Sequence, residues 1–371
     1  YNKNVPKKIN SKSLNHFFNY GFCPSDYSIF EGMQQLLPNS ILTLNLNNWN
    51  LSISTNKKDQ HNKYNNESFS FQKLEDIICD SVNKRLVTDV PKCLLLSSGV
   101  DSSLVSYFAS KIDSQIQTFT VGFKEKFYDE SEKSKKIANH FGLKNETIFF
   151  DERDIIKTIN NIPDAFDEPF ADSSQIPSML IFEKISQHAK VAITGDGGDE
   201  IFYGYNRYQW FLIWKIFFKN NFLANNTTKN ILNYIINKSE KNIIGKKIFN
   251  HLNITTNKTQ KFLNIFFNKK NFYQEFLKLS FTENFLNENT SFKNQDLNNV
   301  EDLKNFDINN YLVDDILTKV DRSSMYYSVE ARSPLLDKNI YLYLSNINSD
   351  KHINIFNKKI LLKKILSNKI P

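Results

Sequence analysis

Residues 92–105 constrain the possible folds of this chain more than any other segment. They begin with an apolar run at 93–96 that is typical of a buried strand, and they lead into a helical pattern that places Leu104, Val105 and Phe108 on one face. The turn between the two patterns holds four serines and one glycine. A strand that enters a helix through such a turn leaves backbone N–H groups free at the helix N-terminus, where they favour an anion such as phosphate. The same residues are also compatible with an ordinary strand–turn–helix corner capped by serine.

Strand and helix patterns alternate from residue 92 to residue 194. We expect strands at 93–96, 117–123, 146–150 and 190–194, and helices at 69–86, 102–111, 131–141, 154–162 and 174–188. This alternation predicts an α/β fold with a doubly wound parallel sheet, in which ligands bind at the carboxyl ends of the strands. Three stretches fall at such ends, namely 97–103, 120–123 and 194–200.

Composition narrows the class of protein. The net charge of +7 is dispersed over 371 residues, which indicates solvated lysines and argues against a nucleic-acid partner. The most apolar segment, at 210–218, is too short to span a membrane and carries Lys215. Cys23, Cys79 and Cys93 have neither metal-site nor disulfide spacing, so we expect a reduced, cytoplasmic protein.

The loop at 194–200 carries three carboxylates, Asp196, Asp199 and Glu200, among three glycines that permit a close approach of the backbone to a ligand. Because Asp101 and Asp199 both follow strands of the predicted sheet, they could share one magnesium ion, which binds a few carboxylates together with phosphate oxygens and waters. Asp101 could equally be a helix cap, and Asp199 with Glu200 a favourable charge at a helix start.

The motif SSGVDSS at 97–103 resembles the SGGxDS pyrophosphate loop of the adenylating ATP pyrophosphatases, with Ser98 in the place of the second glycine. The chain also carries GDGGDE at 195–200, DDILTKVDRSSM at 314–325 and EARSPLLD at 330–337. Together these motifs are similar to those of the glutamine-dependent asparagine synthetases. The resemblance implies an adenine nucleotide α-hydrolase-like fold with C-terminal helices, and it implies that the protein uses ATP and Mg²⁺.

The resemblance also implies a set of site residues. The pyrophosphate would be held by the loop Ser97, Ser98, Gly99, Val100, Asp101, Ser102 and Ser103. The nucleoside would lie between Leu96 and Val121, Thr194 and Gly195 would contact the nucleotide through their backbone, and Asp101 and Asp199 would bind Mg²⁺. The Ser98 hydroxyl could donate to a phosphate.

Catalytic roles are implied for four further residues, Lys359, Asp196, Glu330 and Arg332. Lys359, with Lys358 as the alternative, would stabilise the reacting phosphate and the amide-forming intermediate. Asp196 stands where this family usually has glutamate and would contact the amino acid or ammonia. Asp321, Glu330 and Arg332 would either form a buried ion network or contact the substrate directly.

The implied reaction is the amidation of aspartate to asparagine through a β-aspartyl-adenylate, with ammonia derived from glutamine. Residues 1–66 would be the end of an N-terminal glutaminase domain and a linker, and 67–371 an ATP-dependent synthetase domain with a helical insertion at 205–305. We expect a strand at 41–46, a linker at 47–66, and Asn39 in a left-handed turn that the family usually builds with glycine. A homodimer is compatible with the family, and the sequence does not decide it.

Other functions remain open at this point. A relative of the same fold could amidate another carboxylate, such as a cell-surface sugar acid. Closure of a β-lactam ring is less favoured, because Tyr203 and Tyr205 follow the acidic loop. A tRNA-thiolating enzyme needs a reactive cysteine pair near the loop, and Cys79 and Cys93 are poorly placed for one. Because Ser98 and Asp196 differ from the residues that the family usually has at these positions, a non-catalytic relative is a further alternative.

Overall fold

The computed structural model describes residues 7–25, 27–55, 68–123, 129–219, 297–367 and 369–370. Its centre is a sheet of five parallel strands in the order β5-β4-β3-β6-β7. The strands are β3 (Lys92–Leu95), β4 (Gln117–Gly122), β5 (Asn145–Phe149), β6 (Val191–Ile193) and β7 (Glu330–Arg332). The expected doubly wound α/β fold is confirmed. β7 was not expected, because its three residues carry no strand pattern of their own.

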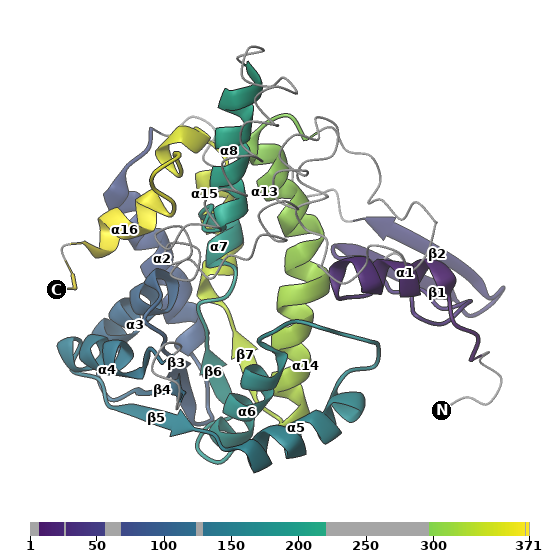
Figure 1. Ribbon diagram of the computed structural model, residues 1–371, viewed down its shortest axis with the longest axis horizontal. Coiled ribbons are helices and arrows are strands. Elements are labelled where there is room, and N and C mark those ends of the chain that lie inside the picture. The colour runs from purple at the N-terminus through teal and green to yellow at the C-terminus, as the bar shows by residue number, and fades with distance from the viewer. Residues whose placement is uncertain are drawn as a thin grey trace, which may run out of the picture.

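Helices cover both faces of this sheet (Figure 1). One face packs against α2 (Phe71–Leu86), α3 (Val100–Ile112), α4 (Ser131–His140), α15 (Lys338–Leu344) and α16 (Ile360–Leu366). The other packs against α6 (Gln175–Ile185) and α14 (Thr318–Tyr326), with α5 (Glu152–Ala165) beside them. The five helices expected before residue 190 are therefore confirmed, with ends that differ by up to three residues.

The pattern of β3 explains why this strand lies in the middle of the sheet. Cys93 is buried in the cluster with α6, and Leu94 is buried in the cluster with α2 and α3. Successive side chains of a strand point to opposite faces, so an apolar run without alternation must be covered on both sides.

The order of the strands places a crevice between β3 and β6. From β3 the chain continues to β4 and β5 on one side, and then returns to add β6 on the other side. The connections that leave the carboxyl ends of β3 and β6 therefore run in opposite directions. Ligands of open α/β sheets bind at this kind of switch point.

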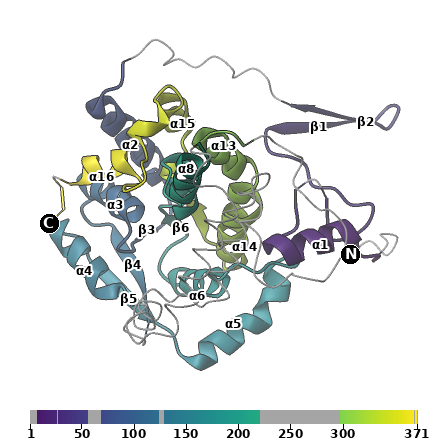
Figure 2. The same cartoon turned by 45° about the horizontal axis from the view of Figure 1, so that its top comes forward.

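The N-terminal part contains α1 (Ser11–Tyr20) and a hairpin of β1 (Ser40–Asn45) with β2 (Asn50–Thr55). The expected linker at 47–66 is wrong over 50–55, because these residues pair with β1, and its residues 56–66 lie outside the described part of the chain. Asn39 has φ of 58°, which confirms the left-handed turn. Figure 2 shows the hairpin projecting away from the rest of the protein.

The predicted helical insertion at 205–305 lies largely outside the described residues. Its described ends are α8 (Asn206–Lys219) and α13 (Val300–Asn309). The remaining short elements are α7 (Gly198–Ile201), the π-helix η1 (Leu312–Leu317), and the 3₁₀ helices η2 (Pro334–Leu336) and η3 (Ser349–Lys351). Within the described ranges, no helix combines the length and apolar character needed to cross a membrane.

Candidate active site

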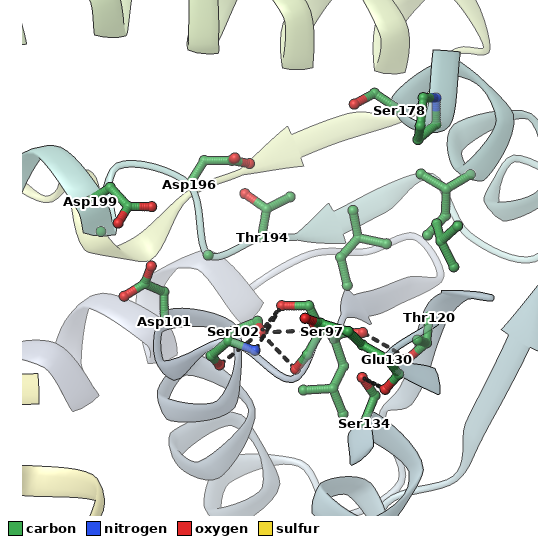
Figure 3. Close-up of a pocket in the computed structure, with 18 of the residues that line it drawn as sticks. Ser97, Asp101, Ser102, Thr120, Glu130, Ser134, Ser178, Thr194, Asp196 and Asp199 are labelled. Atoms are coloured by element: carbon green, nitrogen blue, oxygen red, sulfur yellow. Dashed lines mark hydrogen bonds between the residues drawn. The ribbon is translucent and has the colours of Figure 1, made fainter. Parts of the chain in front are cut away.

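A cavity of about 450 Å³ opens at the carboxyl ends of β3, β4 and β6 (Figure 3). One part of its wall is apolar and includes Leu96, Val121 and Ile181. Asp101, Asp196 and Asp199 lie together at one end, and Thr120, Glu130 and Ser134 lie at the other. The cavity thus offers an apolar surface for a flat ring system and carries polar or charged groups at both ends.

The loop between β3 and α3 is held by its own serines. Ser97 and Ser102 have their hydroxyl oxygens 2.8 Å apart, the Ser102 hydroxyl accepts from the Ser97 N–H at 3.1 Å, and the Ser97 hydroxyl accepts from the Gly99 N–H at 3.1 Å. These hydroxyl oxygens therefore accept from two backbone N–H groups of the loop. Gly99 is the N-cap of α3 and has no side chain, so no capping side chain accepts from the first N–H groups of the helix.

The second loop contacts the first so closely that only glycine fits. A Cβ at Gly195 would stand 2.8 Å from the Ser102 nitrogen, and a Cβ at Gly198 would stand 2.4 Å from Cγ of Asp101. Both are far below ordinary van der Waals distance. The glycines of GDGGDE thus allow the expected meeting of the two loops, which is confirmed.

Lys359 joins the two loops. Its Nζ contacts a carboxylate oxygen of Asp101 and lies 2.7 Å from Oδ1 of Asp199, with only 11% of its side chain exposed. The two carboxylates raise its pKa against the lowering effect of burial. Its backbone is left-handed, with φ of 53°, a conformation that is uncommon for non-glycine residues and recurs at active sites. The neighbouring Lys358 instead contacts Asn206, at 2.6 Å.

The carboxylates at this end of the cavity are suited to a divalent cation. Burial raises the pKa of Asp101 to about 6 although Lys359 acts in the opposite direction, and Oδ1 of Asp101 is buried without a hydrogen-bond partner. An orphaned carboxylate oxygen beside a second carboxylate fits a magnesium ion. In the described part of the chain no group of three or more histidine, cysteine, aspartate or glutamate side chains forms a metal site, so phosphate and water would have to complete the coordination.

Two further acids line the same end. Burial raises the pKa of Asp196, while a hydrogen bond from the Thr194 hydroxyl lowers it. Burial also raises the pKa of Glu200 to about 7, and its carboxylate accepts a hydrogen bond from the Tyr205 hydroxyl. Groups with pKa values moved toward neutrality are typical of sites that transfer protons.

Ser98 and Glu130 form a contact that no sequence pattern predicts. The Ser98 hydroxyl, expected to be available to a phosphate, donates to Oε2 of Glu130 at 2.6 Å. Glu130 lines the cavity, whereas Ser98, Val100 and Ser103 are not among the lining residues. Glu130 follows Asp129 and directly precedes α4. Acidic residues are common at the start of a helix, so nothing in the sequence assigns Glu130 to a site.

A cluster of polar side chains that contains Lys319, Asp172 and Asp315 was also not predicted from the sequence. Nζ of Lys319 lies 3.1 Å from Oδ1 of Asp172, and the pKa of Asp315 is raised to about 7 by burial and then by Asp172. Lys319 and Asp315 belong to the motif at 314–325, and Asp315 lies on the π-helix η1. π-helical turns recur at functional sites. The motif could have pointed to these residues, but their burial depends on the packing of α14.

Glu330 and Arg332 lie away from the cavity. Arg332 pairs with Glu330 at 2.8 Å and donates to the backbone oxygens of Arg85 and Val87, where α2 ends. The expectation of a buried ion network is wrong, because the side chains of Asp321 and Glu330 are exposed to solvent. Only the backbone of Arg332 reaches the site, since its oxygen accepts from the Thr194 N–H. The catalytic roles of these two residues stay predictions.

The cysteines offer no reactive thiolate beside the phosphate loop. Burial raises the pKa of Cys93 to about 12, and burial together with nearby acidic groups raises that of Cys79. Both cysteines are free. This chemistry disfavours the thiolating alternative.

Fold and site define a class of α/β protein with a serine-rich loop and an acidic glycine loop at the switch point of a parallel sheet. A family model described as asparagine synthase matches residues 73–371, so the chain belongs to the asparagine synthase family.

Curated relatives carry matching names. The glutamine-hydrolyzing asparagine synthetase 1 of Bacillus subtilis is 26% identical over 377 residues, which cover 98% of this chain and 57% of that protein. The glutamine-hydrolyzing asparagine synthetase of Sandersonia aurantiaca is 34% identical over 140 residues, covering 34% of this chain and 26% of that protein. The chain therefore spans little more than half the length of its Bacillus relative.

Among solved structures, the NH3-dependent NAD synthetase of Campylobacter jejuni is similar over 37% of this chain and 62% of that one. Its sequence identity is 15% and its TM-score is 0.26.

Proposed function

We propose that this protein is an ATP-dependent ligase that amidates aspartate to asparagine through a β-aspartyl-adenylate. The family membership supports an amidotransferase-type ligase. The observation that carries the finer proposal is the meeting of Asp101, Asp199 and Lys359 at the switch point of the sheet. Two carboxylates for a metal ion and an ammonium for a reacting phosphate are the groups that adenylation of a carboxylate needs.

ATP would lie across the cavity. Its adenine would contact the apolar wall at Leu96 and Val121, and the backbone of Thr194 and Gly195 would follow the sugar and α-phosphate. Its β- and γ-phosphates would take the N–H groups of Ser97 and Gly99 from the serine hydroxyls that now occupy them. Asp101 and Asp199 would hold Mg²⁺, which when bound neutralises the charge of the triphosphate.

In the first half-reaction, a side-chain carboxylate oxygen of aspartate bonds to the α-phosphorus, and the bond from that phosphorus to pyrophosphate breaks. Lys359, which already contacts both aspartates, would stabilise the charge on the phosphate. In the second half-reaction, ammonia bonds to the acyl carbon, its extra proton passes to solvent or to an ionised carboxylate such as that of Asp196, and the bond from the acyl carbon to the AMP oxygen breaks so that AMP departs. The product is asparagine.

Glutamine would supply the ammonia in the whole protein. We assign residues 1–66 to the end of a glutaminase domain and its linker, and 67–371 to the synthetase domain. Contacts between the two parts support an interface between them. The Ser25 N–H donates to the carboxylate of Asp314, and the Ile29 N–H donates to Glu168 at 2.7 Å. The hairpin beyond it is exposed along both strands, which fits a part that belongs to a neighbouring domain.

The test is aspartate-dependent ATP–pyrophosphate exchange in the presence of Mg²⁺, followed by asparagine formation with ammonium chloride as the nitrogen source. Exchange with aspartate and none with uronic acids supports the proposal. Exchange with a uronic acid alone would assign the site to sugar amidation. Equal exchange by the wild type and Asp101→Ala would remove the assigned metal site, and no exchange with either acceptor would leave a non-catalytic relative.

A further inference from the structure

Glu130 is placed beside the phosphate loop by its own helix. It stands directly before α4, and its backbone oxygen accepts from the N–H groups of Lys133 and Ser134, both at 3.1 Å. Asp129 fixes the same turn, because its carboxylate accepts from the N–H groups of Ser131 and Phe123. The carboxylate of Glu130 is thus held at the rim of the cavity and does not swing on a free loop (Figure 3).

Among the residues that the structure describes, no cation pairs with the Glu130 carboxylate. Its contact from a side chain is the Ser98 hydroxyl, which is neutral, and no ion pair to Glu130 is found in the described ranges. This arrangement is unusual for a loop that would bind phosphates, because a carboxylate repels them. A serine hydroxyl also has only one hydrogen to donate. Ser98 can therefore serve either Glu130 or a phosphate oxygen at one time.

We propose that Glu130 sets the affinity of the loop for pyrophosphate, by competing for the Ser98 hydroxyl and by repelling the leaving group so that it departs. The inference rests on the proposed function, since it concerns the product of the same site. Cleavage of ATP adds a negative charge to the departing pyrophosphate, so the repulsion is larger for the product than for ATP. Pyrophosphate also lacks the adenosine that anchors ATP to the apolar wall.

The expected effect follows from Coulomb's law. Removing one negative charge at roughly 6 Å from the pyrophosphate, with an effective dielectric constant near 40, strengthens binding about tenfold. Glu130→Gln keeps the shape of the side chain and its ability to accept from Ser98. Ser98→Ala removes the competing hydroxyl and keeps the charge. Glu132→Gln is the matched control, because it removes an exposed charge from the first turn of the same helix.

The experiment is calorimetric titration of magnesium pyrophosphate into the full chain, for the wild type and the three variants, with a thermal melt of each to establish that it is folded. We expect Glu130→Gln to bind pyrophosphate about tenfold more tightly, and the KM for ATP to fall by a smaller factor. Glu132→Gln should bind as the wild type does, and Ser98→Ala no more tightly than the wild type.

Unchanged or weaker binding of pyrophosphate by Glu130→Gln would overturn the inference, and so would equal tightening by Ser98→Ala or by the control Glu132→Gln. These outcomes leave the proposed function intact, because the wild type still binds pyrophosphate in all of them. If the wild type itself does not bind magnesium pyrophosphate, the assignment of the phosphate loop fails, and the inference falls with it.

Discussion

Replacing Gly204 with alanine should separate the groups that we assign to catalysis without touching any of them chemically. Gly204 follows α7, and its N–H donates to the backbone oxygen of Asp199 at 2.7 Å. An added Cβ would stand 1.9 Å from Oδ1 of Asp199 and 2.0 Å from Cε of Lys359. Each group must therefore retreat by about 1 Å, and a displacement of that size in a catalytic group costs roughly a hundredfold in rate.

The assay for Gly204→Ala is aspartate-dependent ATP–pyrophosphate exchange, with kcat/KM about a hundredfold below that of the wild type. Gly142→Ala is the control, because a Cβ there meets nothing within 4 Å although φ is +71°. It should lower stability by about 1–2 kcal/mol through backbone strain and leave exchange unchanged. Wild-type exchange by a folded Gly204→Ala protein would refute the requirement that Lys359 and Asp199 act from their present positions.

Three other predictions follow from the same structure. Asp101→Asn should lower exchange by about 10²–10³-fold at every magnesium concentration, because one carboxylate of the pair is lost, and a rate near that of the wild type would contradict its role. Asp315 has a pKa raised to about 7, so the native state holds this proton more tightly than the unfolded chain, and stability from this group is lost as pH rises from about 4 through 7. Between pH 5 and pH 8, the free energy of unfolding of Asp315→Asn, measured in urea, should therefore fall by roughly 1–3 kcal/mol less than that of the wild type. Parallel pH profiles of the free energy of unfolding would contradict this prediction. Ile53→Lys should change the free energy of unfolding by less than about 0.5 kcal/mol, because this side chain is 64% exposed. Leu74→Ala removes a side chain that is 0% exposed and should lower the free energy of unfolding by about 2–5 kcal/mol. If thermal melts showed similar losses for the two variants, the hairpin would not be peripheral to the fold.

The strands and helices between residues 69 and 194 were predicted from sequence because each carries its own pattern. β3 reads as an apolar run and α3 as a helical face, and both patterns arise from neighbours along the chain. The glycines at 195, 197 and 198 indicated a close backbone approach, and their surroundings bear this out. Asn39 likewise revealed its left-handed turn through residue type alone.

The features that the sequence did not predict depend on contacts with other parts of the chain. β7 is a strand only because β6 lies beside it, and β2 is a strand only because β1 folds back on it. Glu330 and Arg332 appear in a strong motif, yet the direction of their side chains is set by the end of α2. The contact of Glu130 with Ser98 depends on how the start of α4 meets the phosphate loop.

The sequence by itself determined the order of strand, turn and helix, and the kinds of residue in each loop, because side-chain periodicity and turn chemistry act over a few neighbouring residues. The places of Asp101 and Asp199 after two strands already predicted that their loops meet, but only the tertiary structure decided that Lys359 contacts both carboxylates. β6 pairs with β3, which brings the loop at 194–200 beside the loop at 97–103, and α16 brings Lys359 to both loops because it packs against α3. These are long-range packing choices that no local pattern encodes.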